Sequence, residues 1–235
     1  MKSLGDLSLE EWQAGQIILI DKPLRWTSFD AVKKVHYLIR KKFGVKKIKV
    51  GHAGTLDPLA TGLLILCTGK FTKLIDTISV QEKAYTGHFV IGATTASYDL
   101  ESPVENEMDW REVTPEMLLG EAKSMTGEQD QMPPIFSAKK VDGLRAYDAA
   151  RSGRSIALKT SRITISEFKI ETSKIPEVPF EIVCSKGTYI RSMAHDFGEK
   201  LGIGAYLGSL RRTRIGDYSV DDAAGMVAFE ESLSQ

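Results

Sequence analysis

The chain has 235 residues, of which 42% are hydrophobic and 26% charged, and its 31 basic residues balance its 31 acidic ones. This composition is that of an ordinary soluble globular protein. No apolar run approaches the roughly 20 residues that cross a bilayer, and the first twelve residues carry three carboxylates without an apolar signal segment. We therefore expect a cytoplasmic protein that does not bind a membrane.

The charges are segregated along the chain although they cancel in total. Residues 31–56 hold eight Lys or Arg and no carboxylate, whereas residues 99–121 hold eight carboxylates and one arginine. Basic residues return in two later clusters, 139–159 and 211–214. One such cluster alone is typical of a solvated face, but three together indicate a basic surface that binds a polyanion.

The predicted elements mix strands and helices without regular alternation. We expect strands over residues 16–20, 45–50, 84–94, 156–170, 178–185 and 206–215. We expect helices over residues 28–43, 70–78, 115–125, 144–152, 188–201 and 221–229. The helix caps are predicted at Ser28 and Thr114 and the helix stops at Gly44 and Gly127. This order predicts an α+β fold with a largely antiparallel sheet.

The stretch Gly51–Gly69, GHAGTLDPLATGLLILCTG, holds a single acidic residue. Pro58 pushes Asp57 out of the α region, and Gly62 lets backbone or ligand come close. The apolar residues 63–67 form either a buried strand or a short helix. A carboxylate on a stiff loop above a buried element is typical of a catalytic acid or nucleophile. An Asx-type turn with a helper proline is the alternative interpretation.

Metal sites and disulfides find no support in the sequence. Cys67 and Cys184 lie in apolar stretches without a CxxC or Cys/His ligand spacing, so we expect buried reduced thiols. The histidines are scattered and form no HExxH-like pair.

Other short motifs also fail. Gly69-Lys70 lacks the spacing of a phosphate-binding loop. Ser137-Ala138-Lys139-Lys140 matches the S-x-x-K of acyl-transfer enzymes, but S-D-N is absent and residues 186–188 read K-G-T. Arg191 is informative, because a guanidinium at a helix N-terminus faces the unfavourable end of the dipole. Its position predicts a carboxylate or a phosphate opposite it.

Five blocks of the chain carry a family resemblance. LIDKPLRWTSFDAV and GHAGTLDPLATGLLILCTGK resemble the TruB family of tRNA pseudouridine synthases. PPIFSAKKVDGLRAYDAARSG, CSKGTYIRSMAHDFGEKLG and YLGSLRRTRIGDYSV are similar to that family's later blocks, in the same order. The resemblance implies one catalytic domain over residues 1–235, with an extended mixed, mostly antiparallel sheet flanked by helices and no cofactor or metal. It also implies conversion of uridine 55 in the TΨC loop of tRNA to pseudouridine, with a nucleophile and a flipped base.

The resemblance also assigns roles to residues. Asp57 matches the nucleophile, and attack on ribose C1′ or on the uracil ring are both open. Tyr85 matches the tyrosine that stacks on the target base, and Arg191 matches the arginine that pairs with the catalytic carboxylate. His52 matches a histidine that contacts the flipped loop. The remaining substrate-binding positions are Lys22, Tyr189 and Leu210, and for Lys22 and Leu210 a purely structural role is the alternative.

The chain departs from the family pattern in two places. Ala96 and Tyr98 occupy a segment where the family often has an aspartate, which puts an RNA contact there in doubt. The chain ends at Gln235 without the C-terminal PUA domain of many relatives, so we expect residues 33–49 to carry more of the phosphate contacts. We expect a monomer whose partner is the T-arm of tRNA. The alternative function is a catalytically inactive RNA-binding protein or tRNA chaperone of the same fold.

Overall fold

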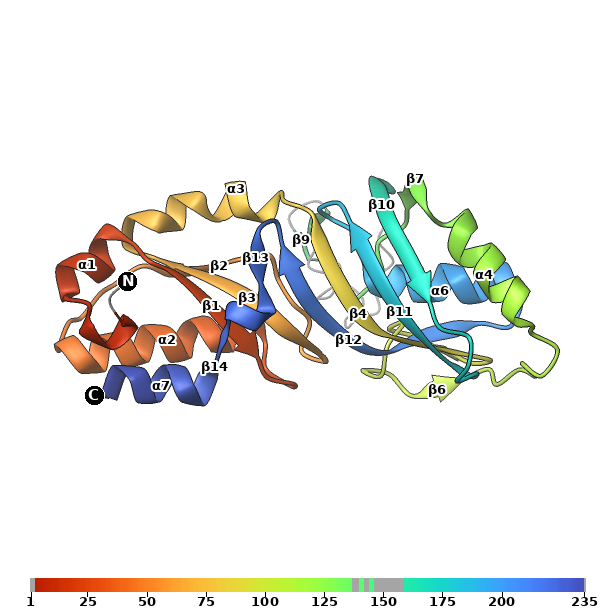
Figure 1. Ribbon diagram of the computed structural model, residues 1–235, viewed down its shortest axis with the longest axis horizontal. Coiled ribbons are helices and arrows are strands. Elements are labelled where there is room, and N and C mark those ends of the chain that lie inside the picture. Colours follow the sequence, from red (N-terminus) through yellow and green to blue (C-terminus); the bar gives the residue numbers. More distant parts are fainter. Residues whose placement is uncertain (1–2, 137–139, 142–143, 146–158, 235) are drawn as a thin grey trace. The chain divides into compact units, whose positions relative to one another are not determined.

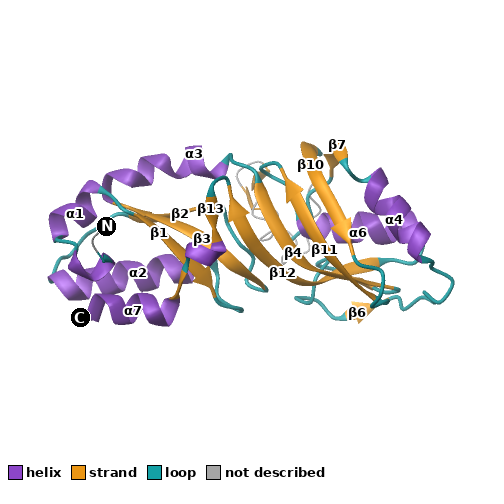
Figure 2. Ribbon diagram, viewed as in Figure 1, coloured by secondary structure: helices purple, strands orange, loops and turns teal. Residues whose placement is uncertain are grey.

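The computed structural model describes residues 3–136, 140–141, 144–145 and 159–234. The chain divides into two compact units, one made of residues 1–85 and 211–235 and the other of residues 86–210. It leaves the first unit within β4 (Lys83–Ile91) and returns to it within β12 (Ala205–Ile215). Figure 2 shows strands flanked by helices in each unit, and the predicted α+β fold with a mixed, mostly antiparallel sheet is confirmed.

The first unit has strands β14, β1, β3 and β12 in that order, with β2 beside β3 and β13 beside β12. Apart from the parallel pair β1–β14, the strand pairs with a known register here are antiparallel. The elements that complete this unit are η1 (Leu4–Asp6), α1 (Leu9–Ala14), β1 (Ile17–Lys22), α2 (Ser28–Phe43), β2 (Val50–Ala53), β3 (Ala60–Thr68), η2 (Gly69–Leu74), α3 (Ile75–Ser79), β13 (Tyr218–Ser219), η3 (Val220–Asp222), β14 (Ala224–Gly225) and α7 (Met226–Ser234).

The apolar run of residues 63–67 is a strand, since it forms the centre of β3. Leu64 and Leu66 belong to a core that also contains residues of α2 and α7, whereas Leu63 and Ile65 belong to a second core with α3. A strand buried on both faces reads as a continuous apolar run rather than as an alternating one. In Figure 1, α2 and α7 lie next to each other, and α7 also contacts η1.

The helix predicted over residues 28–43 is confirmed as α2, but its cap is Thr27 rather than Ser28. The Thr27 hydroxyl accepts from the Asp30 amide, and the Asp30 carboxylate accepts from the Thr27 amide. This reciprocal capping box satisfies two amides that the helix leaves unpaired. Gly44 ends the helix in the left-handed conformation, as predicted.

Several predicted boundaries are wrong. Of the strand expected over residues 45–50 only Val50 is in a strand, and Lys46, Lys47 and Lys49 are exposed. A pattern of β-branched residues makes a strand only where a neighbouring strand pairs with it. The terminal helix begins at Met226 rather than at residue 221, after η3 and β14.

In the second unit the cap predicted for α4 at Thr114 is confirmed, but the helix ends at Ser124 and Gly127 begins β7. The helix predicted over residues 144–152 begins with a strand, since residues 144–145 form β9, and the rest lies outside the described residues. Ser137 and Lys139 of the S-x-x-K motif also lie outside them.

The second unit has the strand order β12, β4, β11, β10, β7, so β4 is a central strand, as predicted. Phe89 of β4 is at its core, with its ring centroid 4.5 Å from that of Phe180, 5.6 Å from Phe197 and 6.0 Å from Phe168. The other elements of this unit are β5 (Thr94–Thr95), β6 (Val104–Glu105), α4 (Pro115–Ser124), β7 (Gly127–Gln131), β8 (Lys140–Val141), β9 (Leu144–Arg145), β10 (Ser161–Ile170), β11 (Glu177–Cys184) and α6 (Ile190–Leu201).

Cys67 and Cys184 are buried thiols, as the sequence predicts. No described helix has the length and apolar character that crossing a membrane requires. Among the described residues no group of three or more His, Cys, Asp or Glu side chains gathers as a metal site would require.

Candidate active site

Asp57 lies in the loop between β2 and β3, and the chain on both sides of it is tethered. The Ser28 hydroxyl accepts from the Leu56 amide across 2.8 Å and donates to the Leu56 carbonyl across 3.0 Å. The Pro58 carbonyl accepts from the Arg25 amide across 2.7 Å. The Ser28 hydroxyl thus holds this loop instead of capping α2, which Thr27 caps. A loop fixed in this way presents its carboxylate in one position.

A third tether comes from Arg212 of β12, whose side chain is almost completely buried. Its Nη2 donates to the Gly54 carbonyl across 3.0 Å, its Nη1 to the Thr55 carbonyl across 3.3 Å and its Nε to the Leu63 carbonyl across 2.8 Å. One guanidinium thus joins the start of the Asp57 loop to β3. Neighbouring Arg211 points elsewhere and forms a two-pronged ion pair with Asp21.

In the sequence Arg212 is only one member of the basic cluster 211–214, and its structural role was not predicted. The alternation of side chains along the predicted strand indicates which arginine is buried. Arg212 is two residues after Leu210 in a predicted strand, and side chains two apart point to the same face. Because Leu210 is predicted to face a pocket, this alternation predicts that Arg212 faces the interior as well.

Lys22, at the end of β1, is completely buried. Its Nζ donates to the carbonyls of Pro23 and Trp26 across 2.9 and 2.6 Å. Burial lowers the pKa of Lys22 to about 8; the Asp57 carboxylate raises this pKa and the Arg212 guanidinium lowers it further. Lys22 is therefore both a structural tether and a cation whose charge acts on Asp57.

Two further predicted residues belong to the first unit. His52 is on β2 in register with Leu66 and is partly exposed. Burial, and then the nearby charge of Arg212, lower the pKa of His52, so its neutral form is favoured. Tyr85 is on β4 and only 7% of its surface is exposed.

Arg191 lies in the first turn of α6 in the second unit, with 5% of its surface exposed. It donates from Nη1 to the Ser97 carbonyl across 3.3 Å and from Nη2 to the Phe136 carbonyl across 3.0 Å. Its Nε lies 3.7 Å from Oδ2 of Asp99. The prediction of an anion opposite Arg191 is confirmed, and one such anion is Asp99. Pairing of Arg191 with the catalytic carboxylate stays a prediction.

Asp99 is itself fixed by hydrogen bonds, and no sequence pattern predicted a role for it. Its Oδ1 accepts from the Ser97 hydroxyl across 2.6 Å and from the Glu101 amide across 3.0 Å. In the sequence Asp99 is one of the eight carboxylates of residues 99–121. Nothing local separates a buried carboxylate from its exposed neighbours, because burial here depends on α6 and on the chain before it.

Tyr189 precedes α6, which begins at Ile190 rather than at Thr188. The side-chain amide of Gln131 accepts from the Tyr189 amide across 2.8 Å and donates to its carbonyl across 3.0 Å. Ser192 donates to the Met132 carbonyl across 2.7 Å. These bonds fix the helix start that carries Arg191. Leu210 is 9% exposed, on β12.

Two family models cover most of the chain. Residues 40–190 match the model described as the N-terminal domain of TruB family pseudouridylate synthases. Residues 191–234 match the C-terminal domain of tRNA pseudouridylate synthase B. The chain belongs to the TruB family.

Curated TruB relatives resemble this chain over nearly their whole length. The protein named tRNA pseudouridine synthase B in Flavobacterium johnsoniae is 54% identical over 225 residues, which are 95% of this chain and 98% of the relative. The protein of the same name in Phocaeicola vulgatus is 47% identical over 95% of both chains. The prediction of a tRNA pseudouridine synthase is thus confirmed at the level of the family.

A solved structure shows the same fold at greater distance. The structure titled "Crystal Structure of a Cbf5-Nop10-Gar1 Complex" matches with a TM-score of 0.68 and 24% identity, over 93% of this chain and 54% of the other. At 24% identity this match supports a shared fold and nothing more. This chain therefore shares its fold with part of a larger chain.

Proposed function

We propose that this protein converts uridine 55 in the T loop of tRNA to pseudouridine, with Asp57 as the nucleophile. The observation that carries the proposal is the Asp57 loop, held by Ser28, Arg25 and Arg212 and lying in the field of the buried Lys22 ammonium. The names of the curated relatives give the substrate, tRNA. We also propose that residues 1–235 act as one catalytic domain, as a cytoplasmic monomer.

The reaction is an isomerisation. The bond from N1 of uracil to ribose C1′ breaks, a bond from C5 to C1′ forms, C5 loses a proton and N1 gains one. No net oxidation occurs, so the protein has to supply a nucleophile, a site that holds the detached base and groups that move protons. Attack of Asp57 on C1′ or on the uracil ring gives a covalent adduct in either case, and both require the ionised carboxylate.

The other residues have supporting roles in this proposal. Tyr85 stacks on the flipped base and takes part in proton transfer, and Arg191 supplies the cation that keeps the catalytic carboxylate ionised. His52 contacts the flipped loop, and its lowered pKa favours a neutral imidazole there. The remaining substrate contacts come from Tyr189 and Leu210, while the completely buried Lys22 acts on Asp57 through its charge.

The first experiment measures conversion of uridine in a minimal T-arm stem-loop under single-turnover conditions. Asp57→Asn is expected to abolish conversion while the dissociation constant of the RNA stays within a few-fold, because the amide keeps the shape but is no nucleophile. Asp76→Asn, at an exposed carboxylate of the same unit, is the control and is expected to keep the wild-type rate. Conversion near the wild-type rate by Asp57→Asn would refute the assignment.

A second experiment separates chemistry from binding at Tyr85. Tyr85→Leu preserves an apolar side chain but loses the ring and the hydroxyl. The rate of conversion is expected to fall far more than the affinity for the stem-loop. Equal losses in rate and affinity would count against a chemical role for this tyrosine.

A further inference from the structure

The first unit contains a groove along α2 that none of the assigned catalytic residues lines. A cavity of about 490 Å³ adjoins α2, β2 and η2, and a second of about 650 Å³ continues from it toward the end of α1. The two share His36, Ile48, Lys49 and Thr72, so they form one groove, which we call the α2 groove. Each volume lies in the range of roughly 300–1,000 Å³ typical of ligand sites.

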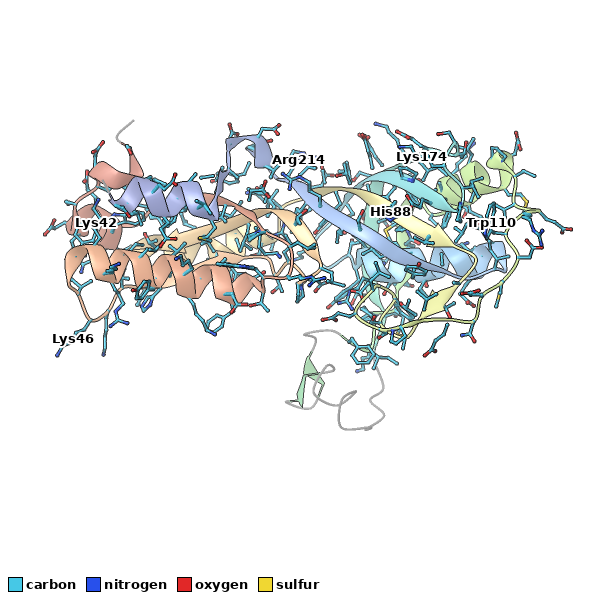
Figure 3. All side chains as sticks on the ribbon, turned by 90° about the horizontal axis from the view of Figure 1, so that it is seen from below. Lys42, Lys46, His88, Trp110, Lys174 and Arg214 are labelled. Carbon is cyan, nitrogen blue, oxygen red and sulfur yellow. The ribbon has the colours of Figure 1, made fainter. Side chains whose placement is uncertain are left out.

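The α2 groove is strongly basic. Five lysines contribute to its lining, and no carboxylate does among the described residues around it. Four of them, Lys47, Lys49, Lys70 and Lys73, are exposed and form no salt bridge within the part of the chain that the structure describes. Figure 3 shows Lys46, next to Lys47, projecting away from the ribbon after α2. Unpaired lysines gathered in one groove favour a polyanionic occupant.

The end of the groove near β2 is different in character. Its floor contains Val32 and Ile48, which are buried, and its wall includes Phe29, which is 59% exposed. The Lys33 ammonium lies 4.7 Å from the centroid of the Phe29 ring. An exposed aromatic ring beside cations is the combination on which unpaired nucleobases stack.

We propose that the α2 groove binds a single-stranded segment of the RNA substrate. An unpaired base lies against Phe29, and the phosphates that follow it lie along Lys49, Lys47, Lys70 and Lys73. The proposal rests on the proposed tRNA substrate and adds to it a second point of attachment. RNA fits this groove better than an acidic protein does, because lysines account for the phosphates and Phe29 for a base.

The first test removes charge. The triple variant Lys47→Gln, Lys49→Gln, Lys73→Gln is expected to weaken binding of tRNA at least tenfold, with the loss in KM rather than in kcat. The slope of log Kd against log salt concentration is expected to become shallower by about two, because three phosphate contacts are lost. The matched control neutralises three exposed lysines of the second unit, Lys123, Lys169 and Lys174 (Figure 3 labels Lys174). Its dissociation constant for tRNA is expected to stay within twofold of the wild-type value.

The second test examines the base. Wild-type protein is expected to bind a short unstructured oligoribonucleotide at least fivefold more tightly than the same oligomer with one abasic position, and Phe29→Ala is expected to remove this preference. Tyr37→Ala is the control, since Tyr37 is similarly exposed on α2 but does not line the groove. Thermal unfolding midpoints of all variants are measured, so that a folding defect is recognised.

The groove proposal is overturned if the triple variant binds tRNA within twofold of wild type with an unchanged salt slope. It is also overturned if Phe29→Ala keeps the preference for the intact oligomer, or if polyglutamate binds as tightly as RNA of equal charge. If the wild-type protein does not convert the T-arm uridine while these binding results hold, only the proposed function is refuted. If it converts the uridine but the groove variants bind RNA as the wild type does, only the groove proposal is refuted.

Discussion

Arg212 donates a hydrogen bond from Nη2 to the backbone carbonyl of Gly54 across 3.0 Å. A side chain from β12, far along the sequence, thereby holds the loop that carries Asp57 three residues later. The same guanidinium also bonds to the carbonyls of Thr55 and Leu63. The position of the proposed nucleophile therefore depends on a contact that closes the first unit.

Replacing Arg212 with glutamine is expected to destabilise the protein by about 3–5 kcal/mol, since its buried guanidinium is the charged donor to three backbone carbonyls. The rate of conversion is expected to fall with it, because the loop is no longer fixed. Denaturant unfolding and single-turnover kinetics measure the two effects. Arg211→Gln is the control: its pair with Asp21 is partly exposed, so less than about 1 kcal/mol is expected. Equal losses from both variants would contradict the role given to Arg212.

Gly62 is expected to tolerate no side chain. Its φ is +102°, and an added Cβ would lie 2.3 Å from the backbone oxygen of Arg212. Gly62→Ala is therefore expected to cost about 3 kcal/mol in unfolding free energy. Gly120→Ala, in an open position within α4, is the matched change and is expected to stabilise by about 0.5–1 kcal/mol. A Gly62→Ala protein as stable as wild type would show that this close approach is absent.

Asp99 is expected to act as a positioning residue for Arg191. Asp99→Asn leaves a buried guanidinium without this anionic partner and is expected to destabilise by about 2–3 kcal/mol. It is also expected to lower kcat more than it raises KM for the stem-loop. The exposed pair of Asp109 with Arg111 provides the control, and Asp109→Asn is expected to leave the free energy of unfolding essentially unchanged. Unchanged kcat in Asp99→Asn would remove the link to Arg191.

The buried Lys22 is expected to make the stability of the protein depend on pH. Its pKa in the folded protein is about 8, below the ordinary value of 10.5, so between these values the unfolded chain binds the proton that the folded chain lacks. The cost of burying the charged ammonium is fully present below about pH 8 and is lost as the pH rises toward 10.5. The free energy of unfolding of the wild type is therefore expected to rise by up to about 3 kcal/mol relative to that of Lys22→Met over this pH window.

Urea unfolding of wild type and Lys22→Met at several pH values from 7 to 10 measures this difference. Lys41→Gln, at an exposed lysine of α2, is expected to follow the wild-type curve. Curves of wild type and Lys22→Met that run parallel would contradict the lowered pKa. The rate of conversion is also expected to decrease above about pH 8, because the loss of this charge weakens the field at Asp57.

The local parts of the fold follow from sequence patterns. The bounds of α2, the cap of α4 at Thr114 and the strand character of β12 all depend on neighbours within a few residues. The strand predicted over residues 45–50 was wrong because a strand needs a partner, and apolar periodicity does not supply one.

The family, the acidic residue Asp57 in its proline-marked loop and the need for an anion near Arg191 follow from the sequence, since they rest on motifs and on the helix dipole. Three other features emerge only in the folded chain: Asp99 is such an anion, Arg212 rather than Arg211 is buried, and lysines from α2, from the segment between α2 and β2, and from η2 share one groove. They could not be predicted because the burial and pairing of charges depend on segments brought together from distant positions. The sequence states which chemical groups each residue carries, and tertiary packing determines which partners those groups contact.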